Sequence, residues 1–289
     1  LNTGLSDNEI LVRDWDTNPT YKSYRKGDRL DLGTWGMQCI GMFRSYQDID
    51  EYFTKYNITS YMGYAKEDVK PGMLIYKDVR GERQADGTYA APDGVVSAEN
   101  DQVRLSNRNN PYSMTMNLNA EWKGISLTAQ FNASWGGYSF LPDDAISLGN
   151  QGTSANNYND LEYANMPSFW NTDNMFVYND VVDAAGNVVV KANRNGKYPN
   201  LRWSSVNAQK SSYWRISGTR IKLNRLTLAY RIPSKYTKML GIESCRFNVT
   251  GQNLLSFYNP YPDNFIDPMT IYGNYPTLRK FTIGVNLTF

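Results

Sequence analysis

The chain has 289 residues with 30 basic and 28 acidic side chains, and its net charge of +2 excludes the strong basic field that binds nucleic acid. It has no histidine, which excludes histidine-based acid–base catalysis, Ser-His nucleophiles and His-ligated metals. We also expect no catalytic residue, no metal site and no cofactor. Aromatic residues form 14% of the chain, which suits the girdles of a membrane barrel, a soluble β-core or a sugar-binding surface.

The first hundred or so residues give modest strand signals. Residues 14–25 predict a weak strand, and residues 33–44 predict a clearer one with alternating apolar side chains. We expect residues 26–32 to join these two strands and residues 45–111 to form a long loop. Cys39 lies in this part of the chain; its distance in sequence from Cys245 leaves open a disulfide or two unpaired thiols.

The clearest hairpin follows at residues 112–136. Apolar and polar residues alternate strictly over 112–122 and again over 125–136, and Lys123-Gly124 makes a very short turn between them. Because strand side chains alternate between faces, each of these strands has one apolar and one polar face. Strands of about ten residues with this pattern are typical of transmembrane barrels.

Three more strands are predicted beyond a long connection at 137–212. Residues 219–231 alternate with one phase slip near Asn224-Arg225, which indicates a β-bulge. Residues 245–257 resume the alternation. The final segment, 280–289, places Phe, Ile, Val, Leu and Phe on one face and ends the chain on an aromatic residue, as the closing strand of an outer-membrane barrel does.

The connections alternate in length. If the chain's last residue lies on the periplasmic side, the long connections are all external, and they are 45–111, 137–212 and 258–279. The shorter ones are then periplasmic, and they are 26–32, 123–124 and 232–244. This asymmetry is expected of outer-membrane barrels. The sequence thus predicts an all-β fold, a portion of a large antiparallel transmembrane β-barrel in the outer membrane.

The alternation also assigns side chains to faces. The apolar set, which includes Met114, Leu118, Leu127 and Phe131, should face lipid. The polar set should line the lumen, and its candidates are Asn117, Asn119, Gln130 and Asn132. Aromatic residues at strand ends should form interface girdles, and these are Tyr112, Trp122, Trp135, Tyr230 and Phe257.

Candidate substrate contacts lie in the 137–212 connection. Flat aromatic faces beside an amide suit both sugars and peptides, and the candidates are Tyr158, Tyr163, Phe169, Trp170 and Asn171. The alternative is that these aromatic residues pack against neighbouring loops or a partner protein. The adjacent acids Asp143 and Asp144 suggest a glycosidase pair, but neighbouring residues of a strand point to opposite faces, and solvated turn residues are the simpler interpretation.

Six segments in a fixed order carry a family resemblance. They are Gly41-Met42-Phe43-Arg44 within 41–49, Lys70-Pro71-Gly72 within 70–81, Tyr198-Pro199-Asn200-Leu201, 220–233, 249–255 and 279–289. With them the chain resembles the C-terminal part of SusC/RagA-type TonB-linked outer-membrane transporters of the Bacteroidetes. It departs from that pattern at Val79-Arg80-Gly81-Glu82, where the family's Asp-rich element is reduced, so no cation loop is expected.

The resemblance implies a function and partners. It implies import of oligosaccharides or oligopeptides, driven through TonB and assisted by a SusD-like surface lipoprotein, with membrane lipid around the barrel and no enzymatic step. It also implies a barrel of about 22 strands and a plug domain. We predict roughly seven strands here, too few to close such a barrel, so we expect the plug and the TonB-contacting part to lie outside this chain. Two rivals are a soluble all-β glycan-binding or glycan-cleaving domain and a passive porin-like barrel.

Overall fold

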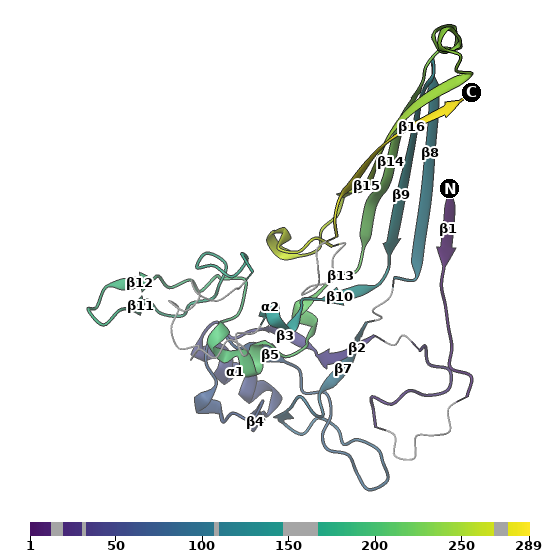
Figure 1. The fold of residues 1–289 in the computed structure, drawn as a ribbon. Helices are drawn as coiled ribbons and strands as arrows, with labels where there is room; N and C mark the ends of the chain where they lie inside the picture. The colour runs from purple at the N-terminus through teal and green to yellow at the C-terminus, as the bar shows by residue number, and fades with distance from the viewer. Residues whose placement is uncertain (13–19, 31–32, 107–109, 147–166, 269–276) are drawn as a thin grey trace. The chain divides into compact units, whose positions relative to one another are not determined.

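The computed structural model describes residues 1–12, 20–30, 33–106, 110–146, 167–268 and 277–289. Within them the chain forms two compact units (Figure 1). The sheet unit comprises Leu1–Asp7, Asn109–Tyr138 and Ser217–Phe289. The loop unit comprises Asn8–Arg108 and Ser139–Ile216.

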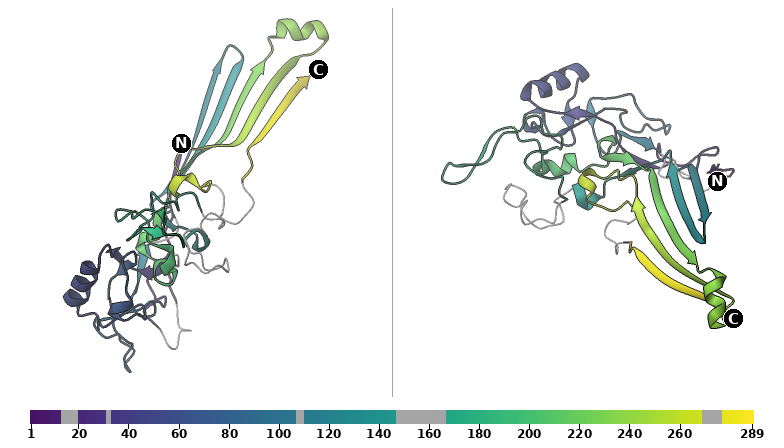
Figure 2. Two further views of the ribbon diagram at one scale, coloured as in Figure 1. Left: turned by 90° about the vertical axis from the view of Figure 1, so that its left-hand side faces the viewer. Right: turned by 90° about the horizontal axis from the view of Figure 1, so that it is seen from above.

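The sheet unit contains one antiparallel sheet of six strands in the order β1-β8-β9-β14-β15-β16. The strands are β1 (Asn2–Leu5), β8 (Tyr112–Trp122), β9 (Ile125–Trp135), β14 (Arg220–Arg231), β15 (Ser244–Ser256) and β16 (Lys280–Thr288). Short helical turns join some of them, namely α4 (Ser234–Thr237), η5 (Lys238–Leu240) and η6 (Pro262–Asn264). Figure 2 shows the long strands side by side in chain order.

Five of these strands confirm the sequence predictions closely. The expected strands 112–122, 125–136, 219–231, 245–257 and 280–289 correspond to β8, β9, β14, β15 and β16, each within a residue or two at its ends. Each pairs antiparallel with the next one along the chain. The all-β fold class is thus confirmed, as part of a barrel-type sheet.

Local backbone geometry explains the hairpin and the phase slip. Lys123 and Gly124 have φ angles of 49° and 84°, and two positive φ values make the type I′ turn that matches strand twist. The register of β14 shifts between Leu223 and Arg225 against both neighbouring strands. The predicted bulge at Asn224 is therefore confirmed. It keeps apolar residues on one face through the phase slip.

The expected strands before residue 45 are wrong. Residues 33–44 form two short strands, β2 (Thr34–Met37) and β3 (Cys39–Met42), which pair with β7 (Gln102–Ser106) and β5 (Leu74–Tyr76) in the loop unit. Their alternation has another cause: Met37 and Phe43 are fully buried in a local core. Residues 20–25 of the weak 14–25 strand form no strand, and residues 14–19 lie outside the described residues.

The sequence prediction missed β1, and this changes the connections. β1 pairs with β8, so residues between Leu5 and Tyr112 form one long connection at the same end of the sheet as the other long ones. Residues 26–32 are therefore no periplasmic turn between barrel strands. β1 is four residues long with every residue exposed, a segment too short to show a period-two pattern.

The loop unit has ordered secondary structure of its own, where the sequence predicted only long loops at 45–111 and 137–212. Its further elements are α1 (Tyr46–Tyr56), β4 (Ser60–Tyr61), η1 (Lys66–Asp68), β6 (Val95–Val96), α2 (Asp143–Ile146), β11 (Val181–Val182), β12 (Val188–Val190), η3 (Leu201–Trp203), α3 (Ser204–Asn207) and η4 (Ser212–Trp214). Two further strands, β10 (Tyr138–Phe140) and β13 (Arg215–Ser217), pair with each other.

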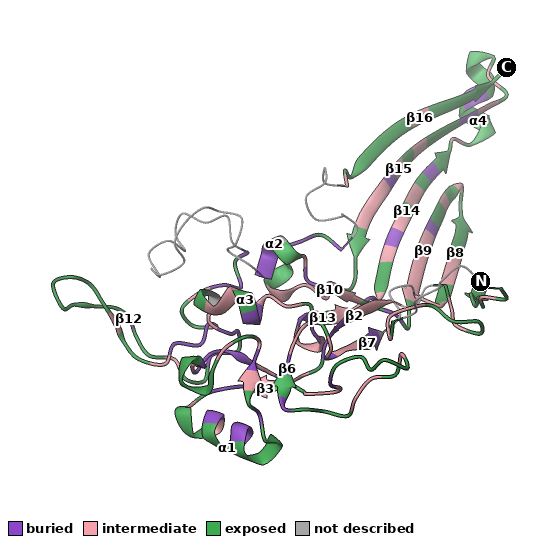
Figure 3. Ribbon diagram, turned by 90° about the horizontal axis from the view of Figure 1, so that it is seen from below, coloured by how far each residue is buried: buried purple, intermediate pink, exposed green. Residues whose placement is uncertain are grey.

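Helix α1 illustrates how this unit is built. Ser45 caps the helix, and Asp48 bonds back to the Ser45 backbone to complete a capping box. Ile49, Tyr52 and Phe53 lie on the buried face of the helix (purple in Figure 3). The Tyr52 hydroxyl donates to the backbone oxygen of Tyr76 at 2.5 Å, so the polar end of this buried ring has a partner.

Cys39 and Cys245 are both free thiols. Cys39 lies in the loop unit, where burial raises its pKa to about 11. Cys245 is buried within the sheet unit, opposite Leu287 on the neighbouring strand.

Among the residues whose positions the structure describes, no helix is both long enough and apolar enough to cross a membrane.

Candidate functional site

The polar face of the six-stranded sheet is the first candidate surface. The four residues predicted to line a lumen share this face: Asn117 lies opposite Gln130, Asn119 opposite Thr128, and Asn132 opposite Thr115. The Asn132 amide donates to the Thr115 hydroxyl at 3.0 Å. Neutral polar side chains on this face therefore hydrogen-bond across the strands. They would lack such partners in an apolar core.

The polar pattern continues across the next strands. Thr128, Thr227, Thr250 and Thr282 lie opposite one another on β9, β14, β15 and β16. The hydroxyl oxygens of Thr227 and Thr250 lie 3.0 Å apart. The middle of this face is therefore a neutral hydroxyl surface that water can solvate.

The opposite face of the sheet is apolar and exposed. Leu118 and Leu228 are each 50% exposed, and Ile283 on β16 is 78% exposed. Met114 and Phe131, predicted to face lipid, lie on this same face and are only partly buried. An apolar sheet face of this extent is found only where another apolar medium or protein covers it.

Aromatic residues stand at both ends of this apolar face. Tyr112 and Trp135 pair in register with ring centroids 5.9 Å apart, near the long connections. Trp122 and Tyr230 lie near the short turns at the other end. All four are exposed, as expected of side chains in membrane interfaces.

Of the aromatic candidates in the 137–212 connection, the structure describes Phe169 and Trp170, and both are buried. Tyr158 and Tyr163 lie outside the described residues. Phe169 is fully buried and Trp170 nearly so; their rings contact Tyr198, and the Trp170 indole donates to the Ala145 backbone oxygen at 2.7 Å. These two rings present no free face, which fits the alternative of loop packing.

The polar and acidic candidates of this connection have local roles. The Asn171 side-chain oxygen accepts from the backbone amides of Asp173 and Asn174 at 3.1 and 2.9 Å, so it shapes a turn. Asp143 begins α2 and lies 3.9 Å from the Lys210 ammonium, with both side chains largely in solvent. A single surface ion pair fits the interpretation of solvated acids.

The chain is similar to known proteins in part of its sequence and in its fold. No protein-family model matches it. A curated relative, TonB-dependent receptor P3 of Formosa agariphila, is 34% identical over 86 residues, covering 25% of this chain and 8% of the receptor. Two solved structures share the fold: that of the RagAB peptide transporter (TM-score 0.56, 16% identity, 99% of this chain) and that of the RagAB peptide importer in the closed-closed state (0.52, 19%, 92%).

The chain is similar to the SusC/RagA type of TonB-dependent transporter. This confirms the predicted resemblance, and it supports the predicted outer-membrane location. The chain spans only 26% and 24% of the two solved chains.

Two of the six segments that carry the SusC/RagA-type resemblance, 70–81 and 198–201, meet in the core of the loop unit. Gly72 has a φ of 97°, and a Cβ atom there would lie 2.9 Å from the Phe176 ring. The buried Asn207 side chain accepts from the Leu74 amide at 2.8 Å and donates to the backbone oxygens of Gly72 and Asn200. The 70–81 and 198–201 segments are therefore held together by one amide.

Arg80 stands where the SusC/RagA-type pattern would have an acidic element. Its guanidinium donates to the backbone oxygens of Asn100 and Gln102 at 2.6 and 2.7 Å and lies 4.0 Å from the centre of the Tyr21 ring. Within the described part of the chain, no group of three or more acidic or cysteine side chains is arranged to hold a metal ion.

No role was predicted for the basic residues in the strands of the six-stranded sheet. Every one of them lies on the polar face, and they are Arg220, Lys222, Arg225, Arg231, Arg246 and Lys280. Glu121 is the one acidic residue within the described strands of the sheet. The predicted bulge could have revealed this basic surface in the sequence. When residue 224 is left out of the alternation, Arg225 shares a face with Arg220 and Lys222.

Proposed function

We propose that this chain forms part of the wall and the outer loops of a TonB-dependent outer-membrane importer, which takes up oligosaccharides or oligopeptides. The observation that carries the proposal is the sheet with one exposed apolar face, bounded by aromatic residues, and one polar face. A wall between lipid and a water-filled lumen needs this combination. The similarity to a TonB-dependent receptor favours energised import over passive diffusion.

The proposal assigns sides to the two ends of the sheet. The turns at Lys123-Gly124 and at α4–η5 are short, whereas the connections at the other end include the whole loop unit. In barrels of the outer membrane the long loops are extracellular. We therefore place residues 6–111, 137–212 and 258–279 outside the cell.

Residues of this chain take three roles in the proposed importer. Asn117, Asn119, Gln130 and Asn132 line the lumen. Tyr158, Tyr163 and Asn171 remain candidates for substrate contact in the 137–212 connection. Phe169 and Trp170 support this connection from within, because both are buried. No residue performs covalent chemistry.

Two partners complete the proposal. A SusD-like surface lipoprotein would close over the outer loops and hold substrate, and TonB would act through a part of the protein outside this chain. The solved relatives are named as peptide importers, which makes oligopeptide the first substrate class to test.

The rivals predict different observations. A soluble glycan-binding or glycan-cleaving domain would bury one face of its sheet in a protein core, whereas here Leu118, Leu228 and Ile283 are half exposed or more. A passive porin shares the two-faced sheet but would transport without energy.

The test is uptake by cells that carry the full-length protein. Labelled oligopeptides and neutral oligosaccharides are offered separately to the wild type, to a deletion strain and to a strain without TonB. We expect accumulation of one substrate class in the wild type only. Uptake that persists without TonB would support the porin alternative, and equal uptake by the deletion strain would contradict the proposal. Co-purification of a lipoprotein with the tagged protein tests the partner.

A further inference from the structure

The basic residues at one end of the polar face form a continuous zone, here called the basic zone. It consists of Arg220, Lys222, Arg225 and Lys280. Arg220 and Lys222 are two positions apart on β14, so their side chains leave the strand on the same side about 7 Å apart. Arg225 and Lys280 both lie opposite Gln252, from the two sides of β15.

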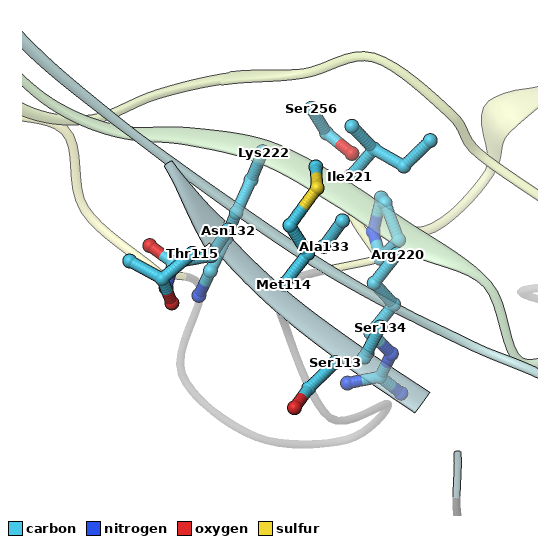
Figure 4. A pocket seen from close by; sticks show the side chains of 11 residues that line it. Ser113, Met114, Thr115, Asn132, Ala133, Ser134, Arg220, Ile221, Lys222 and Ser256 are labelled. Carbon is cyan, nitrogen blue, oxygen red and sulfur yellow. The ribbon is translucent and has the colours of Figure 1, made fainter. Parts of the chain in front are cut away.

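The surroundings of the basic zone are polar and neutral. Ser134 lies opposite Arg220, and Asn132 lies opposite Lys222. In Figure 4 the side chains of Arg220 and Lys222 extend to the same side of the sheet as Ser113 and Thr115, whereas Met114 extends to the other side. A hollow of about 290 Å³ at this end of the sheet includes Arg220, Lys222 and Ser256 in its lining.

The basic zone has no acidic counterpart on the described part of the sheet. None of its four residues has a carboxylate within ion-pair distance among the described residues. Within the described strands of the sheet the one acid on this face is Glu121, which is at the turn end of β8, opposite Ser126. Arg246, also near the turn end, already donates to the Ser126 hydroxyl at 2.9 Å.

We infer that the basic zone is a binding site for anionic groups, and that the solute imported past this wall is an oligomer bearing carboxylates. Basic side chains of one sign on a low-dielectric wall focus the potential and raise the local concentration of anions. An arginine adds a planar fork that matches a carboxylate in bidentate geometry. The zone lies at the end of the sheet joined to the long connections, where an entering solute would arrive first.

This inference rests on the proposed import function and narrows its substrate class. Carboxylates occur in acidic peptides and in uronate-containing oligosaccharides, and the recognition chemistry is the same for both. The structure of the site does not distinguish acidic peptides from uronate-containing oligosaccharides, and the probes of the experiment below do. The neutral threonine row beyond the zone would let such a solute pass without a second strong binding step.

The experiment measures binding to the purified full-length protein in lipid nanodiscs. The probes are three labelled peptides of equal length, rich in Glu, Gln or Lys, together with an oligogalacturonate and a neutral oligosaccharide of similar size. At low salt we expect the acidic probe of one class to bind best. Its advantage over the neutral probe should shrink as the salt concentration rises, because mobile ions screen exposed charges.

The variants separate charge from folding. In the double variant Arg220→Gln/Lys222→Gln, the affinity for the acidic probe should fall roughly three- to tenfold, as expected for two exposed charge contacts, with the neutral probe unchanged. The double variant Arg220→Lys/Lys222→Arg keeps both positive charges and should keep the preference for the acidic probe over the neutral one. Lys235→Gln, in the exposed α4 turn, is the matched control and should bind like the wild type.

The possible outcomes distinguish failure of the anion-binding inference from failure of the proposed import function. Equal losses for acidic and neutral probes in the double variant would overturn the inference, because they would indicate a structural role. A wild type that binds peptides or oligosaccharides without preference for acidic ones would overturn the inference and leave the import function standing. A wild type that binds none of the probes would contradict the proposed function itself.

Discussion

Leu118 and Asn119 are neighbours on β8 whose side chains leave opposite faces of the sheet. Leu118, near the middle of the strand, is 50% exposed on the apolar face, and Asn119 lies on the polar face opposite Thr128. Leu118→Arg should destabilise the assembled protein by roughly 2–4 kcal/mol, because it places a charge in hydrocarbon. Asn119→Arg should cost far less. Refolding titrations of the full-length protein in lipid measure both, and equal costs would refute the assignment of faces.

Gly72 tests packing in the loop unit. A Cβ atom at Gly72 would meet the Phe176 ring at 2.9 Å, whereas one at Gly186 would meet nothing within 4 Å. Both glycines have positive φ, near 97° and 85°, so Gly→Ala adds similar backbone strain at each. Overpacking should make Gly72→Ala worse by about 1–3 kcal/mol. Faster protease cleavage of the loop unit in Gly72→Ala than in Gly186→Ala is expected, and matching rates would contradict the packing described here.

At the scale of elements, the bulge in β14 decides which side chains face the lumen. Deleting Asn224 should remove the register shift and leave Arg220 and Lys222 on the polar face, because Leu223 and Arg225 then alternate without a break. Assembly in the outer membrane should survive this deletion, whereas deletion of Thr227, which no bulge absorbs, should turn one half of β14 to the wrong face and abolish assembly. Deletion of Met239, which is 81% exposed in η5, is the control and should be tolerated. Heat-modifiable migration on gels reports folded barrel, and an equal loss of folded barrel in the Asn224 and Thr227 deletions would contradict this assignment of faces.

The sequence predicted the long strands well because their signal is local. Alternation over ten or more residues, the Lys123-Gly124 turn and the phase slip at Asn224 can all be read from adjacent residues. The loop unit could not be predicted in this way. Asn207 donates a hydrogen bond to Gly72, which is far away in sequence. Phe169 is buried because the fold brings the Tyr198 ring, also distant in sequence, against it. The prediction of a barrel strand at residues 33–44 was wrong because apolar alternation occurs in strands of a small buried core as well as in strands of a membrane barrel.

The same limit applies to the candidate site. Period two assigned Asn117 and Gln130 to one face, and the structure agrees. The aromatic candidates Phe169 and Trp170 were chosen by composition, which does not distinguish a ring that binds from one that packs. The basic zone could have been predicted from the sequence. The predicted bulge and the period-two alternation together place its four residues on one face.

At the scale of the whole molecule, the described sheet has two open edges, because β1 pairs only with β8 and β16 only with β15. Unpaired edges are not tolerated in hydrocarbon. Residues 1–289 expressed alone should therefore aggregate, and they should insert when strands that pair with β1 and β16 are supplied. Recovery of the lone chain as a monomeric, protease-resistant species in detergent would contradict this expectation.

The central claim is that one face of this sheet meets lipid and the other meets water. Spin labels placed singly along β8 and β9 of the full-length protein, with Cys39 and Cys245 replaced by serine, test it most directly. Relaxation by oxygen reports contact with lipid, and relaxation by a water-soluble nickel chelate reports contact with water. We predict that the two signals alternate with period two, with oxygen dominant at Leu118 and Leu127 and nickel at Asn119 and Thr128. High nickel access at all four positions would show a sheet outside the membrane and contradict the account.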